Sequence, residues 1–210
     1  MVTSADAGYS SNWVSESGLD LEEGYCITLA RGVRPREALH RLGVSDAAIR
    51  AATWPEFTAE LREPEPAHVS HGVVAAFVMG EHVVLVEDVG YRGRSPEWAG
   101  SVSRGTEAVN VYLSPTSLKE ELSIFRDGQQ VASIDGDEPE VVEGGDAELA
   151  GRLVELTYDA LKPLDEDDEA PEDLSDGRVD LLQVACDYFG LQPEAPDISG
   201  PVLGALVEYR

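Results

Sequence analysis

The fold is decided by residues 72–87, which read GVVAAFVMGEHVVLVE. This stretch contains two apolar runs, 73–78 and 83–86, and both are rich in valine, a β-branched residue that favours strands. The dipeptide Gly80-Glu81 separates them, and a two-residue connection that contains glycine is typical of a tight β-turn. The stretch therefore predicts a β-hairpin, so we expect a fold built on an antiparallel sheet.

Four more stretches have the length and composition of strands, and they are residues 25–30, 108–113, 121–126 and 130–134. The dipeptide Asp127-Gly128 joins the last two and is a strong hairpin signal. Together with the hairpin, these stretches predict a mostly antiparallel sheet of about five to six strands.

Helices are predicted on both sides of the strand-rich region. Pro35 suits the first turn of a helix and Gly43 suits its C-cap. A second short helix is predicted to begin at Ser45 or Asp46 and to end before Pro55.

After the hairpin, Ser95 as N-cap and Pro96 at the first helical position predict a short helix that reaches about Ser103. From Asp146 onward the apolar residues recur with a period of 3.6, so the C-terminal third is predicted to be helical. The fold class is therefore α+β, with N-terminal helices and a C-terminal helical part.

The chain is expected to divide into four parts. Residues 1–12 are polar and are expected to form a flexible N-terminal arm, and residues 13–161 are expected to form the α+β core domain. Residues 162–176 form an acidic linker, whose like charges repel one another. Residues 177–210 are expected to form a C-terminal helical segment packed on the core.

The charge of the chain is strongly negative and uneven. The 210 residues carry 41 acidic and 15 basic side chains, a formal net charge of −26. A surface of this sign repels nucleic acid and anionic membranes and attracts a basic protein partner. Two causes unrelated to binding stay open: the chain has only two lysines, a bias that GC-rich coding produces by itself, and an acidic surface also keeps a protein soluble.

The sequence predicts a cytoplasmic protein. No stretch approaches the roughly 18 consecutive apolar residues of a membrane span, and the first residues lack the pattern of a signal peptide. Cys26 and Cys186 lie far apart, each in an apolar run, and we interpret both as reduced core residues. A cysteine nucleophile or a disulfide is the alternative.

The N-terminal part of the chain contains Tyr25–Gly32 followed by Pro35, Glu37 and 39–43, and the middle contains a second series of short motifs. That series consists of 87–90, Gly93, Pro96-Glu97, 103–106, 109–112 and Asp127-Gly128. With these motifs the chain resembles an uncharacterised actinobacterial domain-of-unknown-function family over most of residues 13–190. The resemblance implies one intracellular domain and no established activity. The chain departs from the family pattern at 113–116 and in its acidic linker.

The sequence offers no motif for catalysis, a cofactor or a metal. Of the four histidines, His68 and His71 are three residues apart in an extended segment, which places them on opposite faces. Surface histidines are expected. The alternative is a site in which His82 approaches His68 or His71 across the hairpin, together with Glu81 or Glu87. The acidic linker lacks the glycine and glutamate that an EF-hand loop needs at its sixth and twelfth positions. No nucleophile elbow, phosphate loop or dinucleotide fingerprint is present. We therefore expect no catalytic residue, no metal and no cofactor.

The segment from Tyr91 to Trp98 is the candidate binding surface outside the linker. Arg92, Arg94 and Trp98 belong to the residue types that dominate binding hot spots. The alternative is structural: Trp98 would pack its helix onto the sheet, and both arginines would pair with nearby acids such as Glu87 and Asp88.

These features favour an acidic protein-binding module, such as an inhibitor or immunity-type protein that neutralises a basic toxin or nuclease. The expected partner-binding residues are Arg92, Arg94 and Trp98 together with five acids of the linker, Asp165, Asp167, Asp168, Glu169 and Asp173. Two alternatives stay open: an enzyme or small-molecule binder with its site between the sheet and the C-terminal helices, and a structural subunit of a larger assembly. The sequence does not determine the oligomeric state.

Overall fold

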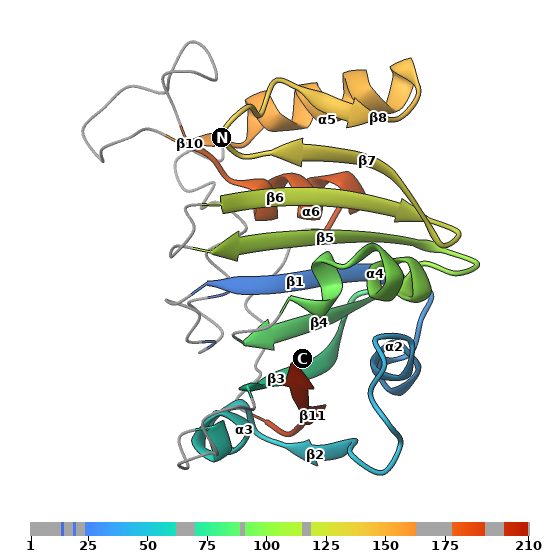
Figure 1. The fold of residues 1–210 in the computed structure, drawn as a ribbon. Helices are drawn as coiled ribbons and strands as arrows, with labels where there is room; N and C mark the ends of the chain where they lie inside the picture. The colour runs from blue at the N-terminus through green and yellow to red at the C-terminus, as the bar shows by residue number, and fades with distance from the viewer. Residues whose placement is uncertain are drawn as a thin grey trace, which may run out of the picture.

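The computed structural model describes residues 14, 19, 24–61, 70–88, 91–114, 119–162, 178–191 and 200–209. Within this part, nine strands form one fully antiparallel sheet in the order β2-β11-β3-β4-β1-β5-β6-β7-β8 (Figure 1). The strands are β1 (Tyr25–Arg31), β2 (Arg50–Ala52), β3 (Ser70–Met79), β4 (His82–Asp88), β5 (Glu107–Ser114), β6 (Lys119–Arg126), β7 (Gln129–Asp135), β8 (Val142–Gly144) and β11 (Val202–Tyr209). The predicted α+β class with an antiparallel sheet is confirmed.

The hairpin predicted from residues 72–87 is present. Strands β3 and β4 pair from Val73 with Asp88 to Met79 with His82, and the turn Gly80-Glu81 joins them. The central strands pair along their full length, and most of their side chains are buried on both faces of the sheet.

The prediction of five to six strands was too low. Strands β2 and β8 have only three residues each, too few to show an alternating pattern. Strand β11 lies between β2 and β3, so the expectation that all of residues 177–210 are helical is wrong for Val202–Tyr209. A short apolar run suits a helix and a strand equally well, and its pairing with β3 across more than a hundred residues decides the structure.

Five α-helices are present in the described ranges, and they are α2 (Pro35–Arg41), α3 (Trp54–Leu61), α4 (Pro96–Val102), α5 (Ala147–Asp159) and α6 (Leu181–Phe189). A 3₁₀ turn, η1 (Arg92–Arg94), precedes α4, and a separate pair of two-residue strands consists of β9 (Leu161–Lys162) and β10 (Arg178–Val179). None of the helices in these ranges is long and apolar enough to cross a membrane.

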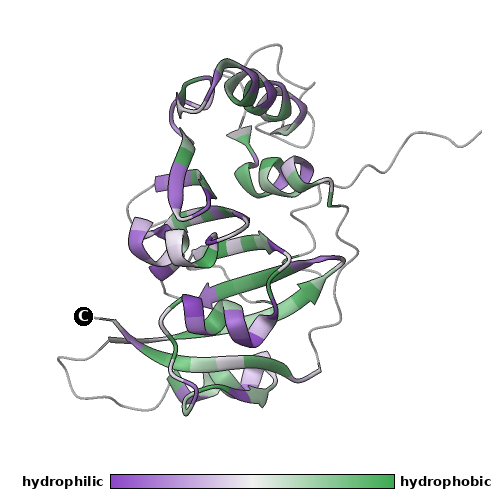
Figure 2. Ribbon diagram, turned by 90° about the vertical axis from the view of Figure 1, so that its right-hand side faces the viewer, coloured by the Kyte–Doolittle hydropathy of each residue, from purple (hydrophilic) through white to green (hydrophobic). Residues whose placement is uncertain are grey.

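The helices cover both faces of the sheet. Apolar residues of α3, α5 and α6 pack in one core cluster with Ile27 and Leu29 of β1. Residues of α2 and α4 pack in a second cluster with the alternate residue Ala30. We call the face under α2 and α4 the front face. Figure 2 shows the strands between these layers coloured mainly hydrophobic, whereas the helices carry both hydrophobic and hydrophilic residues.

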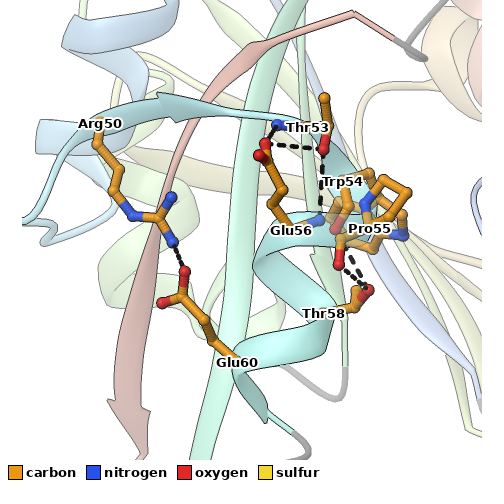
Figure 3. Close-up of polar contacts among 7 residues, drawn as sticks. All are labelled: Arg50, Thr53, Trp54, Pro55, Glu56, Thr58 and Glu60. Atoms are coloured by element: carbon orange, nitrogen blue, oxygen red, sulfur yellow. Dashed lines mark hydrogen bonds and ion pairs between the residues drawn. The ribbon is translucent and has the colours of Figure 1, made fainter.

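The helix predicted between Ser45 and Pro55 is wrong, because the chain there forms strand β2 and then begins helix α3. The hydroxyl of Thr53 accepts a hydrogen bond of 3.3 Å from the N–H of Glu56, whose carboxylate accepts one of 2.7 Å from the N–H of Thr53 (Figure 3). This is a capping box, and proline is tolerated in the first turn of a helix because its missing N–H has no partner there. Pro55 therefore belongs to the start of a helix rather than to a helix end.

The expected division into parts is changed at the C-terminus. Helix α6 packs on the sheet, with Leu182, Ala185 and Phe189 in the main core cluster. Strand β11 belongs to the main sheet, so the C-terminal residues are part of one core with the preceding strands. The expected N-terminal arm, 1–12, and most of the acidic linker, 163–176, lie outside the described residues, while Lys162 belongs to β9.

Candidate functional site

The segment that contains Arg92 and Arg94 is held down on the front face of the sheet. The buried carboxylate of Glu87, 1% exposed, accepts hydrogen bonds from the backbone N–H groups of Arg92 at 3.0 Å and Gly93 at 2.6 Å. A β-carbon at Gly93 would lie 2.5 Å from Oγ1 of Thr28 and 2.7 Å from Nδ2 of Asn110. Only glycine therefore lets the η1 backbone lie so close to the sheet.

Under Gly93 lies a buried polar group on strands β1 and β5. Asn110 donates from Nδ2 to Oγ1 of Thr28 at 2.9 Å, to the carbonyl of Ile27 at 3.3 Å and to Sγ of Cys26 at 3.2 Å. Burial, and then the carboxylate of Glu87, raise the pKa of the Cys26 thiol well above its usual value. A buried, protonated thiol is a poor nucleophile, so this group serves packing and the position of η1.

Arg92 joins three elements. Its guanidinium donates to the carbonyl of Leu42, just after α2, at 3.2 Å and to the carbonyl of Glu208 in β11 at 3.0 Å. It also lies over the ring of Trp98, 5.5 Å from the ring centre. The contact of Arg92 with Glu87 uses the backbone N–H of Arg92.

Trp98 is half-buried and packs α4 against the end of α2. Its ring lies directly against Gly43, so close that a β-carbon at that position would overlap it. Trp98 therefore covers a helix end as well as the second core cluster of the sheet. The structure brings Arg92 and Trp98 together and directs Arg94 elsewhere.

Arg94 lines an open groove on the front face. Its Nε lies 3.1 Å from Oε2 of Glu121, and its guanidinium lies 4.8 Å from the ring centre of Tyr112. The groove has a volume of about 360 Å³. We call it the front groove, and its lining residues are Arg94, Lys119, Glu121, Ser133, Ile134, Asp135, Glu138, Val141 and Glu143.

The floor of the front groove is a row of alternating charges. Nζ of Lys119 lies 3.8 Å from Glu121 and 3.2 Å from Asp135, so the row reads Arg94, Glu121, Lys119, Asp135. The N–H of Asp137, and then Lys119, keep the pKa of Asp135 below its usual value. Each cation of the floor is therefore already neutralised by a carboxylate.

A β-bulge places this row on the front face. The register between β6 and β7 shifts between Ile124 and Phe125, so that Glu121 lies opposite Asp135. Without the extra residue, Glu121 would lie opposite Ile134, because a one-residue shift turns every side chain to the other face of a strand.

The rim of the front groove carries a surplus of negative charge. Glu138 and Glu143 are exposed, and within the described part of the chain neither makes an ion pair. Residues 135–148 contain seven acids and no base. Sequence reasoning missed this segment, although the absence of any lysine or arginine over fourteen residues was a usable signal.

The five acids expected in the linker, Asp165, Asp167, Asp168, Glu169 and Asp173, lie outside the described residues. Strands β9 and β10 bracket them, because Leu161 pairs with Val179 and Lys162 with Arg178. Figure 1 shows β10 toward the same end of the sheet as the end of β7, where the front groove lies.

The histidines and cysteines of the described ranges form no further candidate site. His82 is only 6% exposed, so the expectation of surface histidines is wrong for this residue. No group of three or more histidine, cysteine, aspartate or glutamate side chains that could hold a metal ion is found in the part of the chain that the structure describes. Cys26 and Cys186 are both buried in the core, as predicted, and neither forms a disulfide in the described residues.

Comparison with known proteins places the chain in a family. Neither a curated protein nor a solved structure matches it. One family model, described as a family of unknown function, DUF6461, matches residues 2–184. This match covers most of the chain and confirms the resemblance to an uncharacterised domain family, so the chain belongs to the DUF6461 family of unknown function.

Proposed function

We propose that this chain is an acidic protein-binding module that recognises a basic partner, in the manner of an inhibitor or immunity-type protein that neutralises a toxin or nuclease. The observation that carries the proposal is the front groove, whose rim has carboxylates without ion-pair partners in the described part of the chain. The acidic linker, with Asp165, Asp167, Asp168, Glu169 and Asp173, is proposed to add to the same surface. Arg92 and Trp98 are built into the fold, and Arg94 takes part through the groove.

Electrostatics supports a fast and salt-sensitive association. A net charge of −26 attracts a basic partner over a long range and raises the rate of encounter. Salt weakens this attraction, because charges are screened over about 8 Å at physiological ionic strength. A basic partner should therefore bind at low salt and dissociate at high salt.

A small-molecule binder is the second candidate, and we propose the front groove as its site. The space between the sheet and α6, where such a site was expected, is filled by buried apolar side chains such as Leu182 and Phe189. The front groove, at about 360 Å³, falls within the usual range of about 300–1,000 Å³ for ligand pockets. A structural subunit, the third alternative, would need a large exposed apolar patch. The large exposed apolar residues of the described ranges are Val78, Tyr91, Val141 and Tyr158.

The proposal is tested by recovering partners of the tagged protein from native extract at low and at high salt, with identification by mass spectrometry. A basic protein that is bound at low salt and released at high salt supports the proposal. Partners that are acidic or neutral, or whose binding is independent of salt, would contradict it.

The role of the linker is tested separately. One variant replaces the five linker acids by their amides, and a matched control scrambles residues 165–173 while keeping their charge. We expect the amide variant to bind the basic partner more weakly and the scrambled control to bind it normally. Equal binding by the amide variant would remove the linker from the interface.

A further inference from the structure

The front face of the sheet is only partly covered. Helices α2 and α4 pack over residues such as Ala30, Leu85 and Ala108 of the central strands. Helix α4 approaches β6 and β7 only near their turn, where the N–H of Gly128 donates to Oγ of Ser103. Figure 1 shows no helix in front of the rest of these two strands, and the front groove lies there. The floor of the groove is therefore a sheet face that no described helix covers.

The charges that line the groove indicate which kind of group would bind there. Along the floor, cation and anion alternate from Arg94 to Asp135, and every cation has a carboxylate within 4 Å. Glu138 and Glu143 also line the groove and add two anions, for which the described residues provide no ion-pair partner. A cation from outside would neutralise part of this surplus.

We infer that the front groove receives an arginine side chain that an extended basic segment of the partner protein carries, an inference that rests on the proposed function. A guanidinium presents planar N–H donors that can bond to carboxylates on two sides, and it loses hydration more easily than an ammonium group. Val141, 46% exposed, lies on the rim and offers an apolar surface for the aliphatic stem of the arginine. The hydroxyl of Ser133, which also lines the groove, can accept a hydrogen bond from the guanidinium.

The test uses the full-length ¹⁵N-labelled protein and three short peptides. Each peptide has the sequence acetyl-Ala-Ala-X-Ala-Ala-amide, where X is arginine, lysine or citrulline, the uncharged analogue of arginine. We expect the arginine peptide to shift the amide signals of Ser133, Glu138 and Glu143. The citrulline peptide should leave these signals unchanged, and the lysine peptide should bind more weakly.

The double variant E138Q/E143Q is expected to bind the arginine peptide roughly five- to tenfold more weakly, because it loses two exposed ion pairs. The matched control E155Q/D159N removes the same charge from exposed positions on α5 and should bind as the unchanged protein does. Both altered rim residues are exposed, so the fold should remain intact, and equal urea unfolding midpoints verify this. Equal binding of arginine and citrulline peptides, equal binding of lysine, or unchanged binding by E138Q/E143Q would overturn the inference.

The two proposals can fail independently. One outcome is a basic partner whose affinity is the same for the E138Q/E143Q variant and for the unchanged protein. That result refutes the arginine site in the groove and leaves the protein-binding function supported. If no basic partner exists but the arginine peptide still binds in the groove, the function is wrong and the arginine site stands. A shift caused only by a free polyamine, and by no peptide, would make the groove a small-molecule site and overturn the inference.

Discussion

The carboxylate of Glu87 accepts a hydrogen bond of 2.6 Å from the backbone N–H of Gly93, and both residues are buried. This contact holds η1 on the sheet and thereby places Arg94 at the front groove. It makes the groove depend on a residue that does not line it.

The first prediction concerns Glu87→Gln, which keeps the size of the side chain and removes one strong acceptor. Hydrogen bonds to a charged group are worth about 1.5–3 kcal/mol, so we expect a loss of that order in the free energy of unfolding. Urea unfolding followed by circular dichroism measures it. The variant Glu155→Gln, at an exposed position, removes the same charge and should not be destabilised, so it is the control for the change in net charge. Equal urea midpoints for the two variants would show that Glu87 does not hold η1.

Two glycine replacements should have opposite effects. Gly93→Ala places a β-carbon 2.5 Å from Thr28 Oγ1, and overpacking of this kind costs about 1–3 kcal/mol. Gly151→Ala, in α5, places the new carbon in open space beside its own helix and should stabilise the protein by roughly 0.5–1 kcal/mol, because alanine favours helices. Thermal unfolding of both variants checks the pair, and a stabilised Gly93→Ala would refute the close approach of η1 to the sheet.

His82 should make stability depend on pH. Burial, and then the charge of Arg31, lower the pKa of His82, while Glu81 opposes the shift. Below about pH 6.5 the unfolded chain takes up a proton that the folded protein resists, so stability is expected to fall as the pH falls from there through the lowered pKa.

The comparison with His82→Leu isolates this contribution from the many carboxylates that also titrate. Urea unfolding of both proteins is measured at several values between pH 8 and pH 5. The free energy of unfolding should fall more steeply with falling pH for the unchanged protein than for His82→Leu. Parallel curves would mean that the His82 ring, which lies 4.8 Å from the ring of Phe189, is hydrated in solution.

The capping box of α3 gives a further prediction. Thr53→Ala removes the hydroxyl that accepts from Glu56 and should cost about 0.5–2 kcal/mol. Thr58→Ala, in the same helix, loses only a bond from its hydroxyl to the carbonyls of the previous turn and should change stability by a few tenths of a kcal/mol. Chemical denaturation of the two variants measures both losses of stability. Equal losses would show that Thr53 does not act as the N-cap.

Short sequence patterns predicted those parts of the fold that are stabilised by contacts between residues close in sequence. The hairpin of β3 and β4 follows from two valine-rich runs and the turn Gly80-Glu81, and the capping residue Asp146 marks the start of α5. Strand β11 could not be predicted in this way, since its apolar run is stabilised by β3, which is distant in sequence.

The candidate site was harder to predict than the fold. Arg94, Glu121 and Asp135 come from three segments, and the bulge after Ile124 decides whether Glu121 meets Asp135 or Ile134. No turn residue or periodicity signals such a bulge, because it depends on how the twisted strands pair. The acidic segment 135–148 was visible in the sequence, but its relation to a groove was not.

The insertion of β11 between β2 and β3 has a consequence for synthesis on the ribosome. Residues 202–209 leave the exit tunnel long after β3, and until they do, the ten-residue strand β3 has a free edge on one side. A nascent or truncated chain of this protein therefore carries a long, valine-rich edge that invites pairing with other chains, and chaperones should hold it until release.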